Sequence, residues 1–253
     1  MLTSLSPSDV AWVLGALAFG GFTKGLTGLG LPLITVPVLA SVVGVERAVL
    51  IMVIPSALLN HYTAWTHRDV RGELPEAPRI LLGAIPGVAV GAAVLQVGSD
   101  RLLATSLALW IIVYVALRLV HPHVRIALPA RKRWAPLLGA SAGALQAATG
   151  VSAPIVIPYV DALGVKPRAY VFALCVCFGA FATGHFVLVA ASGLYTPLLL
   201  GQSLFAMAPA LACIPIGIRA RRFISPFWFD WIIRLTLVVM ASRLLYGAWA
   251  VTG

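Results

Sequence analysis

Charged side chains are scarce in this sequence, since Asp, Glu, Lys and Arg make up only 10% of its 253 residues. A water-soluble domain usually carries about a quarter charged and about 45–50% apolar residues, whereas the apolar fraction here is 60%. Too few polar groups are available to cover a globule in water. Because the apolar stretches approach or exceed the roughly 20 residues that cross a bilayer, we expect an all-α polytopic membrane protein of about eight spans.

Other features are also missing, and each absence narrows the function. The three cysteines, Cys175, Cys177 and Cys213, lie inside apolar stretches without metal-ligand spacing, so we expect neither disulfides nor a metal site. No P-loop pattern is present, which argues against ATP hydrolysis, and we expect no cofactor. No pair of acidic residues lies in the middle of a span, which disfavours a sodium or other cation site.

The net charge of +10 could suggest nucleic-acid binding. The cations, however, lie in short loops between apolar segments, where the preference of basic loops for the cytoplasmic side already accounts for them. We therefore expect no nucleic-acid partner.

Six apolar segments have the length and composition of ordinary spanning helices. They cover residues 46–66, 79–98, 101–120, 168–192, 197–218 and 228–250. Two further apolar regions, 10–43 and 135–163, are too long for one crossing and are interrupted by Gly, Thr and Pro. Each of these two regions is either a pair of short helices or a re-entrant hairpin.

The basic loops predict the orientation of the chain, because such loops stay on the cytoplasmic side. They lie at 67–79, 121–134 and 219–226. All three face the cytoplasm only if region 10–43 begins and ends outside and region 135–163 begins and ends inside. Both termini are then predicted to lie outside.

The two interrupted regions resemble each other. A shift that takes Thr27 to Thr149 places T-G-L-G-L-P (27–32) on T-G-V-S-A-P (149–154). The sequence thus predicts two repeats, 1–120 and 135–253, each a broken-helix hairpin plus three spans, with a cytoplasmic connecting loop at 121–134. One hairpin opens outward and the other inward, so the repeats have inverted topology, which is typical of secondary transporters.

The two breaks are candidate anion sites. Pro32 and Pro154 each stand where a second short helix would begin, and the preceding residues let the backbone turn. A helix start carries exposed N–H donors and a partial positive charge, so two facing helix starts would bind an oxyanion from both sides. Nearby polar side chains would complete the site. The predicted substrate-binding residues are Lys24, Thr27, Gly28, Gly30, Pro32, Asn60, Gln146, Thr149, Gly150, Ser152 and Pro154.

A structural interpretation competes with the functional one at these positions. Lys24 would extend to the headgroups if it lay near the outer end of its helix. The small residues of both motifs would serve close helix packing, a role that the G-x-x-x-G spacings at Gly21–Gly25 and Gly139–Gly143 indicate.

Two histidines lie within predicted spans. His61 and the adjacent Asn60 stand near Trp65, so they fit either an interfacial belt or a site that faces substrate. His185 lies deeper in its span, where it would either bind a backbone carbonyl or, with His61, form a proton relay.

The stretch G-F-T-K-G-L-T-G-L-G-L-P-L-I-T-V-P (21–37), followed by N-H-Y-T-A-W (60–65), resembles the TauE/SafE family of sulfite and organosulfonate exporters. The resemblance covers nearly the whole chain, although Ser152 and Ala153 stand where small glycines would be expected. It implies a permease of the bacterial inner membrane, not an enzyme, that exports sulfite, sulfoacetate or a related organosulfonate.

The predicted function is a secondary transporter that moves a small sulfur-containing anion by alternating access, either coupled to protons or by facilitated efflux. Two alternatives stay open. One is an anion channel, and the other is an intramembrane hydrolase in which Ser152 and His185 act as nucleophile and base. The expected partners are the anion and the lipid bilayer, and a homodimer is left open.

Overall fold

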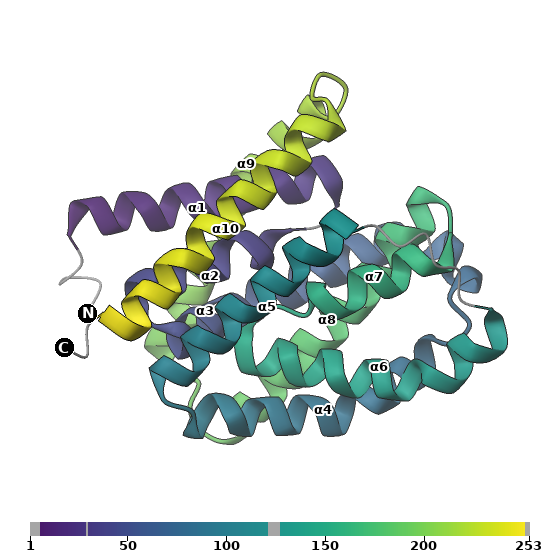
Figure 1. The fold of residues 1–253 in the computed structure, drawn as a ribbon, viewed down its shortest axis with the longest axis horizontal. Helices are drawn as coiled ribbons and strands as arrows, with labels where there is room; N and C mark the ends of the chain where they lie inside the picture. Colours follow the sequence, from purple (N-terminus) through teal and green to yellow (C-terminus); the bar gives the residue numbers. More distant parts are fainter. Residues whose placement is uncertain (1–5, 29, 121–126, 251–253) are drawn as a thin grey trace.

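The structure is a computed structural model that describes residues 6–28, 30–120 and 127–250 (Figure 1). Every regular element within these ranges is a helix, which confirms the predicted all-α fold class. The elements are α1 (Pro7–Thr27), α2 (Leu31–Val43), α3 (Val45–Thr66), the 3-10 helix η2 (Arg68–Glu73), α4 (Ala77–Val97), α5 (Asp100–Val120), α6 (Leu128–Thr149), α7 (Ala153–Leu163), α8 (Pro167–Ala191), α9 (Pro197–Ala220) and α10 (Pro226–Ala250).

Seven described helices are long and apolar enough to cross a membrane, namely α1, α3, α4, α5, α8, α9 and most of α10. The six predicted spans correspond to α3, α4, α5, α8, α9 and α10, with each end within two residues of its predicted position. Length also separates the two parts of the first interrupted region, since α1 has 21 residues and α2 only 13. The first helix therefore has the length of a full span, whereas the second is a short helix.

The second interrupted region differs from the prediction at its start. Helix α6 begins at Leu128, before the expected position 135, so residues 128–134 of the predicted connecting loop are helical. Pro129 favours a helix start, and the charged residues that follow it, although read as a loop, are good helix formers. Residues 121–126 of that loop lie outside the described part of the chain.

Polar contacts gather many helix ends at one end of the molecule. Arg131, near the start of α6, binds Glu76 at the start of α4, and Arg118, near the end of α5, pairs with Asp230 at the start of α10. The start of helix α8 is held at the same end, because Arg168 donates hydrogen bonds to Asp69 of η2. These hydrogen bonds lower the pKa of the Asp69 carboxyl. The described parts of the three basic loops therefore lie at this end, called the basic end below, while the start of α1 and the end of α10 lie at the other (Figure 1).

Glycine faces bring two pairs of helices into backbone contact. A Cβ atom added to Gly21 of α1 would lie 2.2 Å from the carbonyl oxygen of Ala210 in α9, and one added to Gly25 would lie 2.1 Å from that of Ile214. Helices α4 and α6 meet in the same way, because a Cβ on Gly139 would lie 1.9 Å from the carbonyl oxygen of Ile80. The predicted packing role of the G-x-x-x-G spacings is confirmed at these positions.

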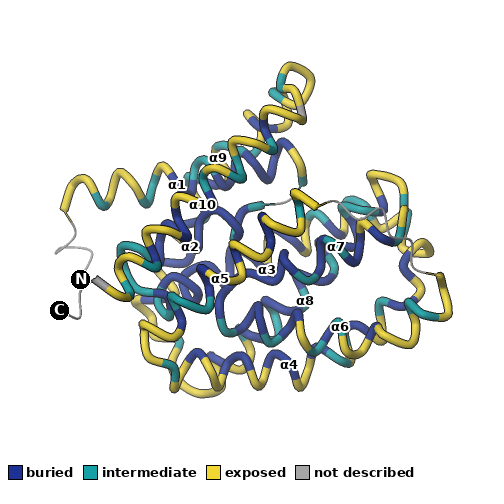
Figure 2. Tube along the Cα trace, in the orientation of Figure 1, coloured by how far each residue is buried: buried dark blue, intermediate teal, exposed yellow. Residues whose placement is uncertain are grey.

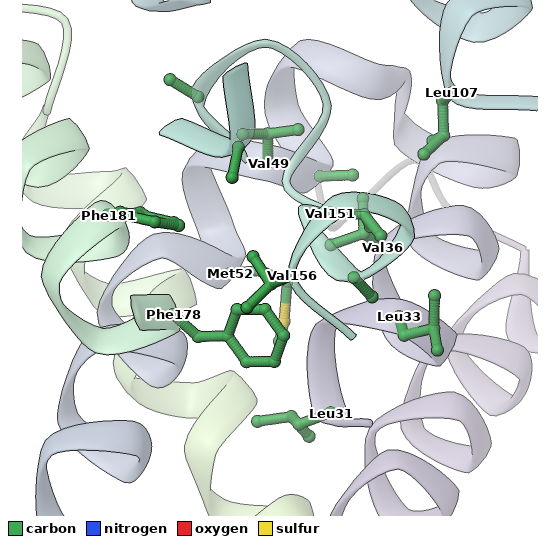
Figure 3. Close-up of a cluster of buried hydrophobic side chains, with 14 of the residues drawn as sticks. Leu31, Leu33, Val36, Val49, Met52, Leu107, Val151, Val156, Phe178 and Phe181 are labelled. Carbon is green, nitrogen blue, oxygen red and sulfur yellow. The ribbon is translucent and has the colours of Figure 1, made fainter. Parts of the chain in front are cut away.

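The buried core is formed mainly by the central helices. Figure 2 shows long buried stretches on α2 and α3, whereas α4, α9 and α10 carry exposed faces. Those faces are rich in large apolar side chains such as Leu82, Phe205 and Leu235, as expected for contact with lipid. Figure 3 shows part of the core, in which side chains of α2, α3, α5, α7 and α8 pack around Val151, a residue of the second break.

The backbone contact of α4 with α6 can be tested at Gly87, where an added Cβ would lie 2.0 Å from the carbonyl oxygen of Ala140. We expect Gly87→Ala to destabilise the protein by about 1–3 kcal/mol, because the two helices must separate. The control is Gly201→Ala in α9, where an added Cβ meets nothing within 4 Å. Thermal unfolding in detergent measures the difference, and equal unfolding temperatures for the two variants would contradict the packing argument.

Candidate functional site

Both predicted breaks are present in the backbone. Helix α1 ends at Thr27, Gly28 and Gly30 take positive φ angles of 82° and 99°, and α2 begins at Leu31. In the second region α6 ends at Thr149, Gly150 takes a φ of 75°, and α7 begins at Ala153. Glycine suits these positive φ angles because it lacks a Cβ. A proline stands in the first turn of the helix that follows each break, as predicted.

One cavity of about 350 Å³ brings the two breaks together. The first break contributes Thr27, Gly30 and Pro32 to its wall, and the second contributes Gln146, Gly150 and Ser152. The breaks are close in space, since a Cβ added to Gly150 would lie 3.1 Å from Val36 of α2. The remaining predicted substrate-binding residues are not among the described residues that line the cavity; these are Lys24, Gly28, Asn60, Thr149 and Pro154.

Sequence reasoning missed the charged part of the cavity wall. Arg118, Arg221 and Asp230 all line it, together with Tyr114 and Tyr170. Arg221 falls in the basic loop 219–226 and Arg118 at the end of the predicted span 101–120, and neither is among the predicted substrate-binding residues. The chain has only eight acidic residues. Asp230, which stands near the start of a predicted span, was therefore a signal that a basic residue such as Arg118 pairs with it.

Two basic side chains hold helix ends around the cavity. Arg118 pairs with Asp161 near the end of α7 at 3.5 Å and with Asp230 of α10 at 3.2 Å. Arg221 donates to the carbonyl oxygens of Leu26 at 2.7 Å and Gly25 at 2.9 Å. A cation at the C-terminus of α1 also complements the negative end of the helix dipole.

Gln146 bridges the second break with its side-chain amide. Its Nε2 donates to the carbonyl oxygen of Gly150 at 3.0 Å, while its Oε1 accepts from the Ser152 backbone N–H at 3.1 Å and from the Ser152 hydroxyl at 2.8 Å. Gln146 is buried. It thus satisfies backbone groups that the helix interruption leaves without helical partners.

Lys24 occupies the matching position at the first break, and it is buried rather than extended to the surface. Only 6% of the residue is exposed. Its Nζ donates to Asn60 Oδ1 at 2.8 Å and to the carbonyl oxygen of Gly28 at 3.4 Å. The alternative in which Lys24 reaches the headgroups is therefore wrong for this structure. Lys24 and Gln146 each bind the carbonyl group of the glycine four residues later.

The two threonines that precede the breaks donate within their own helices. The Thr27 hydroxyl binds the carbonyl oxygen of Thr23 at 2.8 Å, and the Thr149 hydroxyl binds that of Leu145 at 2.7 Å. Such bonds are common for threonine inside helices. Their predicted role as donors to an anion stays a prediction.

The histidines lie apart from the cavity wall as far as the described lining residues show. His61 is exposed, and its Nε2 is 2.7 Å from the Thr183 hydroxyl. His185 is buried, and its Nε2 has no hydrogen-bond partner in the described structure. The Ser152 hydroxyl donates to Gln146 instead. The serine–histidine pair of the hydrolase alternative is therefore not formed.

These features define a class of protein. Helices that can cross a membrane surround a cavity at which two interrupted helices meet, and this arrangement is typical of transporters that bind their substrate at broken helices. The family model described as sulfite exporter TauE/SafE matches residues 13–244. The chain belongs to this family of multi-pass membrane transporters, as its motifs predicted. Neither a search of curated proteins nor one of solved structures found a match.

The conformation of the second break can be tested at Gly150. We expect Gly150→Ala to lower stability by about 1–2 kcal/mol for the positive φ, and further because the new Cβ would lie 3.1–3.2 Å from Val36 and Val49. Gly193 is a matched control, since its φ is also 75° but nothing lies within 4 Å of an added Cβ. Thermal unfolding should show a larger loss for Gly150→Ala than for Gly193→Ala, and a loss of equal size would contradict the packed geometry.

Proposed function

We propose that this protein is a secondary transporter that exports a small sulfur-containing anion, namely sulfite, sulfoacetate or a related organosulfonate. The observation that carries the proposal is the meeting of both helix breaks and two arginines at one cavity. Family membership supports the substrate class.

The cavity wall has the chemistry that an organic anion requires. Arg221 supplies positive charge, and a guanidinium group matches the geometry of an oxyanion. The starts of α2 and α7 add the positive ends of two helix dipoles. Much of the remaining wall is apolar, with Leu33, Ile157 and Phe178 among its residues, which suits the carbon portion of a sulfonate. A volume of about 350 Å³ is within the range of small-molecule sites.

Alternating access requires bonds that close one end of the protein while the other is open. The cavity wall includes Arg221 and Ile224, which follow α9 at the basic end. At the opposite end Arg47 of α3 donates to Gln202 of α9 at 3.1 Å, and the Tyr195 and Ser203 hydroxyls bond to each other. The ion pairs of Arg118 and Arg168 join helix ends at the basic end, so each end carries contacts that would have to break and re-form during transport.

The packing of the helices supports an inverted repeat. Helix α1 packs on α9 as α4 packs on α6, and α3 contacts α9 as α8 contacts α4. Suppose that α1 to α5 correspond in order to α6 to α10. Exchanging the two halves then turns the α1–α9 contact into the α6–α4 contact, and the α3–α9 contact into the α8–α4 contact. A transporter of this kind alternates by moving one set of helices against the other around a fixed site, coupled to protons or by facilitated efflux.

The role of Arg221 gives a direct test of the proposed site. We expect Arg221→Gln to weaken the binding of sulfoacetate or sulfite roughly tenfold, the effect of losing about 1.4 kcal/mol of interaction with the anion. Arg222→Gln is the control, because Arg222 is the next residue but lies over the ring of Phe223 and is not a described lining residue of the cavity. Calorimetry on the purified protein, with sulfate and carboxylates for comparison, measures the dissociation constants. Equal affinities of the two variants would remove Arg221 from the site.

The proposed location is the bacterial inner membrane, with the basic end in the cytoplasm and both termini outside. Lys132 in α6 is exposed near the basic end, and the exposed Leu194 lies in the α8–α9 connection at the other end. In sealed cells a membrane-impermeant thiol reagent should label Leu194→Cys and should spare Lys132→Cys until the cells are opened. The reverse labelling pattern would overturn the orientation.

A further inference from the structure

Lys24 has no acidic side chain among the described residues to balance the charge of its ammonium form. It lies one turn before the first break, is 6% exposed, and donates only to neutral oxygen atoms, those of the Asn60 amide and the Gly28 carbonyl. None of the ion pairs among the described residues includes it.

The elements around Lys24 supply no carboxylate either. Helix α2 has no titratable residue between positions 31 and 43. Helix α3 presents the neutral Asn60 amide, since the adjacent His61 binds Thr183. Helix α8 presents the Cys175 thiol, whose Sγ lies 3.7 Å from the same Gly28 carbonyl oxygen. Another cation, Arg221, directly follows helix α9 and binds the carbonyl groups one and two residues after Lys24.

A buried ammonium group with neutral partners has two ways to become stable. It can release its proton, or it can gain an anion nearby, because an unpaired charge in an apolar interior is costly. The cavity supplies a place for that anion. Thr23, Thr27 and Gly30 line it. Lys24 directly follows Thr23 in α1, and its Nζ binds the carbonyl oxygen of Gly28, which directly follows Thr27. Attraction between an anion in the cavity and a positive charge on Lys24 would be strong, because a buried interior screens charges poorly.

We propose that Lys24 is the proton-binding site of the transporter, and that an anion entering the cavity recruits a proton from solution to the Lys24 amine. The inference rests on the proposed function and adds the coupling group to it. The neutral amine plus one proton gives the ammonium, which balances one negative charge of the bound anion. By linkage, the proton must then favour anion binding as much as the anion favours protonation. Lys24 acts behind the cavity wall instead of binding the anion directly.

The test is calorimetry of sulfonate binding in two buffers that differ in ionisation enthalpy, repeated from neutral to alkaline pH. The probe is 2-hydroxyethanesulfonate, because the charge of its sulfonate does not change over this range. We expect the wild-type protein to take up protons on binding, approaching about one proton per anion as the amine becomes neutral before binding.

Two substitutions at Lys24 separate coupling from structural support. Lys24→Arg keeps a permanent charge, so it should bind the sulfonate without proton uptake and with a pH-independent dissociation constant. Lys24→Gln keeps an N–H donor for Asn60 but no charge, so it should bind about tenfold or more weakly and also without uptake. Lys132→Gln, at an exposed lysine of α6, is the control and should take up protons as the wild type does. Thermal unfolding shows which variants are folded.

Proton uptake that persists in either folded Lys24 variant, or wild-type binding without uptake at every pH, would overturn the assignment while leaving the transporter proposal intact. A folded wild-type protein that binds no sulfonate and no sulfite would instead overturn the proposed function on which the assignment rests.

Discussion

The need to satisfy the backbone at two helix breaks governs the centre of this protein. An apolar interior has no water to bind the N–H and carbonyl groups that an interrupted helix leaves open, so protein atoms must do it. At the second break one neutral amide supplies both donors and acceptors, because Gln146 binds Gly150 and Ser152 together. At the first break the corresponding Lys24 can only donate, and it needs Asn60 from another helix as a further acceptor. The same backbone groups are therefore satisfied by an amide in one half and by a titratable amine in the other.

This difference places two basic groups, Lys24 and Arg221, near the same side of the cavity. Lys24 and Arg221 both bind carbonyl groups near the C-terminal end of α1, whereas Arg118 is held between two carboxylates. The charge of Arg118 is largely balanced, while Lys24 has no carboxylate partner among the ion pairs of the described residues. An anion in this cavity would therefore experience an uneven field that favours the first break.

The sequence was most informative where structure depends on local composition. The six ordinary spans and both breaks were predictable, because apolar length and Gly-Pro patterns act over a few residues. The start of α6 was not, since the same basic residues fit a loop or a helix that extends beyond the apolar region. The burial of Lys24 depends on Asn60, 36 residues further along the chain. The place of Arg118 and Asp230 in the cavity depends on the meeting of α5 with α10, which no local pattern encodes.

The glycine contacts have a mechanical consequence. Where backbones touch, as between α1 and α9 or α4 and α6, neither helix can slide along or rotate against its partner without steric overlap, because interiors at this density do not deform gradually. Each pair of helices therefore moves as one rigid unit. Helix α2 is connected to α1 through Gly28 and Gly30, and α7 to α6 through Gly150, all with positive φ. The short segments that line the cavity are therefore also the points at which each rigid pair can turn relative to the helix that follows.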